Sequence, residues 1–568
     1  MRKVFYRIIV FLAVIVLLQG CLLFQSPDHA TPPTPDISEV WSMQAAYHYS
    51  LGVLNLLDEN VEEAIAEFEK AREFDPKSQV LTAELVILYS EKGAFGKSLE
   101  LLQDALKRHP RDVEMRFLLA GLYASRKDYV QAIREYRAVI ALDPKHTLAY
   151  LYLGILYAEQ KDYQNALDTL EKLPAVDPDH TIGRYYLAKV LMELGQDEQA
   201  EKELKQALAL RPSFESAMMD LGLLYEKQKK FSQAIGVYED FSKAYPTRAK
   251  VRIRLGDLLL REKRHKEAEQ VLQAVMQQHA DNKEILLNIG LVFLERERHE
   301  QAIDLFGKLL ASYPDDQKIR YLLATAYNEK SLPRQALEMF QRIPPDSEFF
   351  ANARIQAAVI LKNEGNTDGA VETVRETIAR KRDAPGLYLF LGTLYDGKKE
   401  YAQAEKILRE GLGILPESTE ILYSLGVLFE KTGRFEDGIK QMRLILAINP
   451  EHADALNFIG YSYADRNLLL SEAEEMIKKA LLLKPGSAHI IDSLGWVYFR
   501  QNRLDQAIHH LAEAARLQPD DATISEHLGD AYLKAGRFKE ALEIYQQSLK
   551  LNPGSNTLPM KIRDLLKK

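Results

Sequence analysis

A period of 34 residues runs through this chain and constrains its fold more than any other feature. In one copy the landmarks are Gly222, Ala234 and Pro246, and the next copy opens 34 residues later at Gly256. A repeat of this length is one supersecondary unit that cannot bury its apolar face alone, so neighbouring copies must stack. Hydrophobic residues make up 46% of the 568 residues, which is enough for one continuous buried seam. The sequence therefore predicts an all-α array that grows in one dimension.

Each copy is predicted to contain two antiparallel helices. The glycine or alanine of the first helix and the alanine of the second are expected where the two backbones approach closely. A larger side chain there would overpack the contact, at a cost of about 1–3 kcal/mol. The proline follows the second helix and ends it. Pro174 falls inside a predicted second helix, so we expect that helix to be bent or shortened.

The period, the small residues and the terminal proline together resemble the tetratricopeptide (TPR) repeat. This resemblance implies an all-α TPR α-solenoid superhelix of about 15 helix-turn-helix repeats. The register slips after Ile343-Pro344-Pro345, which predicts either a worn repeat or a bend between two sub-arrays. The predicted parts are an N-terminal TPR array at 41–345, a degenerate repeat or bend at 346–384, a C-terminal TPR array at 385–555 and a capping helix at 556–568.

The first 20 residues are predicted to be an export signal. Three positive charges, at Arg2, Lys3 and Arg7, precede an apolar run over 8–18. That run is shorter than the roughly 20 apolar residues that a membrane span needs. The signal peptide is therefore assigned to residues 1–20, with an N-terminal anchor helix as the alternative.

The stretch Leu18-Gln19-Gly20-Cys21 resembles a bacterial lipobox, which implies that Cys21 is lipidated and becomes the first residue of the mature chain. The lipidated cysteine and a Pro-rich tether occupy 21–40. An Asp after the cysteine usually holds such lipoproteins at the inner membrane, and this chain has Leu22. The expected location is therefore the outer membrane, facing the periplasm. A plain signal peptide, an inner-membrane location and the cell surface remain alternatives.

Composition excludes several classes of function. Charged residues make up 27%, the sequence pI is near 6.0, and the net charge is −8, so a nucleic-acid partner is not expected. One cysteine permits no internal disulfide. No catalytic, phosphate-binding or metal motif is found, and the chain is predicted to be a non-enzyme without cofactor or metal. The pair His509-His510 is interpreted as two solvated side chains on an outer helix face.

First helices line the inner face of a TPR array, so their groove positions are the candidate binding residues. In the N-terminal half these positions are unusually apolar: Ile87, Phe117, Leu151, Ile155, Tyr185, Met219, Leu223, Leu287 and Leu291. In the C-terminal half they combine aromatic, acidic and basic residues, a mixture typical of binding hot spots: Asn457, Tyr461, Asp465, His489, Asp492, Trp496, Phe499, Arg500, Glu526 and Asp530. The alternative is that some of these side chains only fill the inner wall between helices.

The region 453–535 has a narrower likeness. Its stretches 455–465, 494–500 and 527–530 resemble a group of bacterial TPR lipoproteins of similar length. Some members of that group are outer-membrane adaptors that bring substrates to a periplasmic carboxyl-terminal processing protease. The resemblance implies an adaptor for envelope proteins or peptides, tethered to the membrane by its lipid.

Two other functions stay open from the sequence. One is a structural part of a secretion, pilus or polysaccharide-export machine. The other is a cell-wall-acting enzyme, suggested only by the carboxylates of Asp465, Asp492, Glu526 and Asp530.

Overall fold

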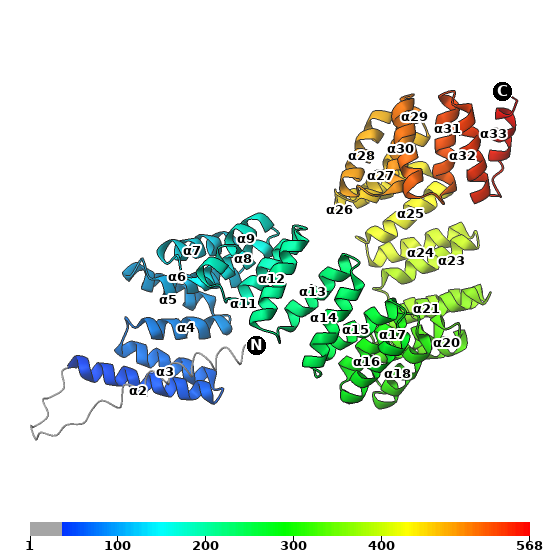
Figure 1. The fold of residues 1–568 in the computed structure, drawn as a ribbon. Coiled ribbons are helices and arrows are strands. Elements are labelled where there is room, and N and C mark those ends of the chain that lie inside the picture. The colour runs from blue at the N-terminus through cyan, green and yellow to red at the C-terminus, as the bar shows by residue number, and fades with distance from the viewer. Residues whose placement is uncertain (1–36, 568) are drawn as a thin grey trace, which may run out of the picture. The chain divides into compact units, whose positions relative to one another are not determined.

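The structure is a computed structural model that describes residues 37–567, with side chains from residue 43 onward. Every regular element in that range is a helix (Figure 1). The predicted signal peptide and Cys21 lie outside the described residues. Helix α2 begins at Ile37, inside the predicted tether of residues 21–40.

The chain divides after Leu258 into two compact units. In the first unit, helices that follow one another in the sequence pack as antiparallel pairs. The pairs are α2 (Ile37–Leu57) with α3 (Val61–Phe74), α4 (Gln79–Glu91) with α5 (Phe95–Arg108), α6 (Val113–Ser125) with α7 (Tyr129–Leu142), α8 (Thr147–Glu159) with α9 (Tyr163–Leu170) and α10 (Leu173–Val176), α11 (Thr181–Glu193) with α12 (Asp197–Leu210), and α13 (Glu215–Lys227) with α14 (Phe231–Ala244).

Helix α15 (Ala249–Arg261) spans the division, and the second unit continues the pairing after α16 (His265–Gln278). Its pairs are α17 (Lys283–Glu295) with α18 (His299–Ser312), α19 (Gln317–Glu329) with α20 (Pro333–Gln341), α21 (Phe350–Asn363) with α22 (Thr367–Arg380), α23 (Pro385–Gly397) with α24 (Tyr401–Ile414), α25 (Thr419–Lys431) with α26 (Phe435–Ile448), α27 (Ala453–Asp465) with α28 (Leu470–Leu483), α29 (Ala488–Arg500) with α30 (Leu504–Leu517), and α31 (Ala522–Lys534) with α32 (Phe538–Leu551).

The small residue of the first helix makes room for a large side chain of the second. A Cβ built on Gly222 would lie 2.1 Å from the Tyr238 ring, and one on Gly290 would lie 2.4 Å from the Phe306 ring. Both rings are fully buried. We expected two backbones to approach at this point. The expectation is confirmed at Gly460, where a Cβ would lie 3.0 Å from the Ala473 carbonyl oxygen, whereas at Gly222 and Gly290 the nearest neighbour is a ring. The reason is geometric, because the ring four positions after Ala234 or Ala302 fills the space between the helices.

Prolines shorten second helices in two places. The helix that should contain Pro174 stops at Leu170 and restarts as the four-residue α10, with Pro174 in its first turn. This confirms the expected interruption, since proline lacks the backbone N–H that the preceding turn needs. Helix α20 has nine residues and ends at Gln341, just before Ile343-Pro344-Pro345. The region 346–384 nevertheless folds as an ordinary hairpin of α21 and α22.

One extra residue in the copy from 453 is absorbed in the turn between α27 and α28. Two residues of that turn, Asn467 and Leu469, have positive φ angles of 60° and 43°. Asn tolerates the left-handed region better than Leu does, because the Cβ of most side chains clashes there. In this longer turn the side chain of Leu469 is 57% exposed.

Helix α33 (Leu558–Leu565) closes the second unit, within the predicted capping segment. It packs against α32 and buries Leu558 and Leu565 in a cluster with Ala541 and Tyr545. Covering the last hairpin in this way keeps its apolar face out of water.

Candidate binding surface

The first helices of successive hairpins also contact one another. Such contacts join α23 to α25, α27 to α29 and α29 to α31 in the second unit. We call the surface made by the side chains of α23, α25, α27, α29 and α31 the C-terminal wall. In the first unit, α4 contacts α6 and α8 contacts α11. The corresponding surface of α4, α6, α8, α11 and α13 is called the N-terminal wall.

The predicted residues of the C-terminal wall differ widely in exposure. Asp465 and His489 are exposed, whereas Asp492 and Trp496 are buried. The other six are half-buried: Asn457, Tyr461, Phe499, Arg500, Glu526 and Asp530. A ligand approaching this wall would therefore meet most of these side chains only in part, and Trp496 hardly at all.

An aromatic stack explains the burial of Trp496. Its ring stacks against His527 with centroids 4.1 Å apart, and against Phe499 with centroids 4.7 Å apart. Arg500 and Lys534 place their cations over Trp496 and Phe499, at 5.9 Å and 4.6 Å from the ring centroids. These contacts link α29 to α31 and fix the centre of the wall.

His527 is a central residue of this wall that the sequence-based selection missed. Its Nδ1 lies 3.0 Å from a carboxylate oxygen of Asp492, and both side chains are buried. Burial alone would lower the pKa of His527, but the hydrogen bond with Asp492 and the negative charges nearby outweigh it and raise the pKa. Only the packing of α31 on α29 reveals the pair, since the two residues are 35 positions apart.

Lys561 of the capping helix binds two of the predicted acidic residues. Its Nζ donates to Glu526 at 2.9 Å and to Asp530 at 2.6 Å. Asp530 also accepts a hydrogen bond of 2.5 Å from the Tyr545 hydroxyl. Burial lowers the pKa of Lys561, and the hydrogen bonds to the two carboxylates more than compensate, so the pKa is raised. Three of the four acidic residues that suggested an enzyme, Asp492, Glu526 and Asp530, thus hold basic partners within the fold.

Three buried polar atoms of the C-terminal wall have no hydrogen-bond partner. They are Nε1 of Trp496, which can only donate, and Oδ1 of Asn457 and Oε2 of Glu430, which accept. Buried polar groups are nearly always paired. All three atoms are closed to solvent, so a partner could reach them only if the side chains around them moved.

A recess of about 290 Å³ opens in the same wall between α23 and α25. Apolar side chains of Leu389, Tyr423 and Val427 line it, and Lys431 donates to Asp396 at 2.7 Å on its border. The sequence selection did not include these residues. Val427 is 42% exposed, and this exposure could not be inferred from the repeat pattern alone.

The predicted N-terminal groove residues are mainly half-buried. Leu151 and Leu287 are buried, and Leu223 is 37% exposed. Three other residues of the N-terminal wall are exposed and were not selected, namely Leu148, Tyr152 and Ile182. The signal that could have found them is their place one helical turn from the selected residues.

The pair His509-His510 is only partly the solvated pair that the sequence predicted. His509 is exposed, but 24% of the His510 side chain is accessible, because its ring packs against Tyr498. Burial, together with the charges of His509 and Lys478, lowers the pKa of His510.

Family profiles match several parts of the chain. Two described as tetratricopeptide repeat cover residues 38–78 with 493–556, and 293–359. A third, described as the C-terminal ARM domain of tetratricopeptide repeat protein 21, covers residues 100–290. With the paired helices and their 34-residue spacing, these matches decide the fold. The fold is a TPR solenoid.

Two relatives share parts of this TPR sequence. The TPR repeat-containing protein PA4667 of Pseudomonas aeruginosa is 32% identical over 173 residues, which is 30% of this chain and 29% of that protein. The BBSome complex member bbs-4 of Caenorhabditis elegans is 29% identical over 117 residues, or 20% of this chain and 25% of that protein. The chain thus spans less than a third of the length of either curated relative.

Solved structures of similar arrangement include Naa15/Naa10 bound to HypK-THB. That match has 13% identity, covers 92% of this chain and 96% of the other, and has a TM-score of 0.43. Yeast Tom70 matches with 16% identity over 80% of this chain and 94% of its own, at a TM-score of 0.36.

Within residues 37–567, none of the helices combines the length and the apolar character that crossing a membrane requires.

Proposed function

We propose that this TPR protein is a membrane-anchored scaffold that holds other proteins of the bacterial envelope on its C-terminal wall. The observation that carries the proposal is the recess between α23 and α25. It lies on the first-helix side of the array and offers exposed apolar surface beside a charged pair. Partner-binding surfaces combine an apolar centre with a polar rim in this way.

The wall continues from the recess toward Asn457 and Tyr461, whose side chains are half-buried and lie on the next first helix, α27. A partner segment would place an apolar side chain against Val427 and exchange hydrogen bonds farther along. The pairs Asp396–Lys431 and Glu430–Arg466, with bond lengths of 2.7 Å and 2.6 Å, would flank its path. Charges at the border of such a surface act mainly on specificity and association rate.

Site-specific photocrosslinking tests the wall directly. A photoreactive residue replaces Val427 on the wall in one strain and Leu444 on α26 in another. The two positions are matched, being aliphatic residues of one hairpin that are 42% and 47% exposed. The proposal expects discrete adducts from position 427 and none of the same mass from 444. Equal adducts from both positions, or none from either, would remove the basis for this surface.

The membrane anchor is a separate part of the proposal and rests on the lipobox resemblance at Cys21. Growth with a radiolabelled fatty acid should label the parent chain, and Cys21→Ser should abolish both the label and sedimentation with membranes. A variant that keeps its membrane association without label would point to an anchor helix instead.

The partner class is proposed from the resemblance of 453–535 to adaptor lipoproteins. We propose a periplasmic carboxyl-terminal processing protease, with its substrates, as the partner. Mass spectrometry of the adducts at position 427 identifies the bound proteins. Adducts that consist only of export-machine components would favour the structural alternative.

A further inference from the structure

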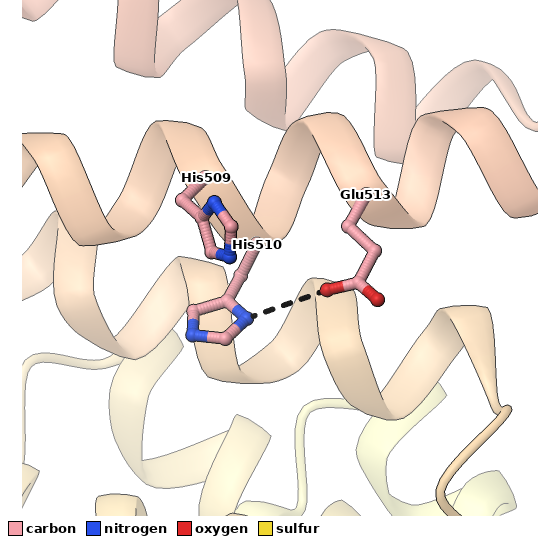
Figure 2. Close-up of side chains that lie close together, drawn as sticks. All are labelled: His509, His510 and Glu513. Atoms are coloured by element: carbon pink, nitrogen blue, oxygen red, sulfur yellow. Dashed lines mark ion pairs between the residues drawn. The ribbon is translucent and has the colours of Figure 1, made fainter.

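The second helix of the α29–α30 hairpin carries a group of side chains outside both walls. Figure 2 shows His509 and His510 side by side on α30, with Glu513 one turn farther along. Glu513 follows the two histidines by four and three residues, the spacings that bring side chains together on a helix. One nitrogen of each ring and one carboxylate oxygen all lie within 4.8 Å of one another. Within the group, His510 Nδ1 and Glu513 Oε2 are 3.9 Å apart.

We propose that His509, His510 and Glu513 bind one divalent transition-metal ion of the zinc class. Imidazole nitrogens and a carboxylate are the ligands that such ions take in proteins. Two ligand atoms that share an ion at about 2.0–2.2 Å lie roughly 3–4 Å apart. The separation of 3.9 Å between His510 and Glu513 already falls in this range. His509 is exposed and the Glu513 side chain is 40% accessible, so both can rotate to close the remaining gap.

His510 supplies the second, independent observation. Its Nδ1 is buried and has no hydrogen-bond partner, although it faces a carboxylate. The ring stacks against Tyr498 of α29 with centroids 5.5 Å apart, so its orientation is fixed by packing. A buried ring nitrogen without a partner is costly, and a metal ion bound there would remove the cost.

The charges around the group are compatible with a cation. Lys478 of α28 lies near His510, but its Nζ is bound to Glu474 at 2.6 Å. Burial would raise the pKa of Glu474, yet hydrogen bonds from Lys478, Gln501 and Arg503 lower it to about 2, so this carboxylate stays ionised and offsets Lys478.

Three protein ligands leave at least one coordination position open. Sites of this kind hold water or a group from another molecule in the open position. Because α30 is a second helix, the site lies on a different element from the C-terminal wall and does not depend on the proposed function. The sequence predicts no metal site, because the burial of His510 by Tyr498 cannot be inferred from the residues next to it in the chain.

Calorimetric titration with ZnCl₂ at pH 7.5 tests the proposal on the full chain without an affinity tag. The parent is expected to bind one zinc ion per chain at a site that His509→Gln and Glu513→Gln each weaken by more than about tenfold. These two variants change accessible side chains, so they should fold normally, which circular dichroism can verify. His489→Gln, at an exposed histidine on α29, is the matched control and should bind as the parent does.

X-ray absorption at the zinc edge gives a second measurement. The parent should show nitrogen and oxygen neighbours with the scattering of two imidazole rings, reduced to one ring in His509→Gln. The proposal is overturned if the parent binds no zinc. It is equally overturned if His509→Gln and Glu513→Gln bind with the affinity and stoichiometry of the parent.

Discussion

The N-terminal and C-terminal walls are made by the same kind of helix, yet their surfaces differ. On the N-terminal wall, Leu148, Tyr152 and Ile182 are 36–43% exposed. On the C-terminal wall, charged side chains join successive first helices, as in Asp396–Lys431, Glu430–Arg466 and Asp492–His527. The buried landmarks of the repeat are alike in both regions. The comparison shows that packing fixes the landmarks and leaves the wall positions free for surface chemistry.

The largest expected effect separates buried from exposed wall aromatics. Trp496→Ala removes a side chain that is 7% exposed and stacked on two rings, so it should destabilise α27–α31 by about 3–5 kcal/mol. Tyr152→Ala, at a ring 42% exposed on the N-terminal wall, is the control and should cost far less. Hydrogen exchange of the amides in each region measures both. Equal losses of protection would mean that the two walls do not differ in this way.

The Asp492–His527 pair should give the C-terminal wall a pH dependence. The pKa of His527 is raised in the fold, so its stabilisation is complete below the ordinary histidine pKa of about 6.5 and is lost as pH rises through the folded pKa. At low pH, Asp492→Asn should lower the free energy of unfolding by up to about 5 kcal/mol, because it leaves a buried, protonated histidine without its carboxylate partner.

Urea unfolding from pH 5 to 9, followed by tryptophan fluorescence in a Trp41→Phe background that leaves Trp496 as the one tryptophan, tests this pair. In the parent, stability of the region should fall with pH across the window above about 6.5. In Asp492→Asn the slope should vanish or reverse, since burial without the carboxylate favours neutral His527. Parallel curves for the two proteins would contradict the assignment.

A smaller effect compares the glycine landmarks of the two units. A methyl group on Gly222 would meet the buried Tyr238 ring at 2.1 Å, whereas one on Gly392 would meet the Leu408 side chain at 3.2 Å. Gly222→Ala should therefore lower the free energy of unfolding by about 1–3 kcal/mol, and Gly392→Ala should lower it less. Thermal unfolding of both variants and the parent measures the two losses of stability. A larger loss for Gly392→Ala would show that the Tyr238 ring moves aside more easily than the Leu408 side chain.

The smallest expected effect is a gain in stability. Leu469 has a positive φ of 43° and is 57% exposed, so its side chain adds strain and little packing. Leu469→Gly should stabilise the α27–α28 hairpin by about 0.5–1 kcal/mol, the relief of a left-handed conformation less the added entropy of the unfolded chain. Hydrogen exchange of the two helices should slow slightly. Faster exchange would indicate that the Leu469 side chain packs more than its exposure suggests.

The hairpins were predictable because their determinants lie close together in the sequence. Gly222 and Ala234 are twelve residues apart, and Pro246 ends the same hairpin. The interruption at Pro174 followed from the missing N–H of one residue. The sequence did not predict which atoms of the second helix lie against the small residue of the first. Whether these atoms belong to the backbone or to a ring depends on the distance between the two packed helices.

The binding residues were less predictable. Tyr461 and Asn457 could be placed on the wall by their position in the repeat, but the selection of Trp496 as an accessible hot spot ignored His527, which stacks on it. Val427 has the opposite error. It was not selected, yet 42% of its side chain is exposed at the recess. The binding role of the selected residues stays a prediction.

The sequence by itself determined that this chain is a stack of helical hairpins, because a 34-residue period sets small, aromatic and helix-ending residues at intervals that only such hairpins can use. The tertiary structure alone decided which wall residues are buried or paired and which stay open. Contacts such as Asp492–His527 and Lys561–Asp530 join residues more than 30 positions apart. Their existence depends on the distance between packed helices, and no local stretch of sequence encodes that distance.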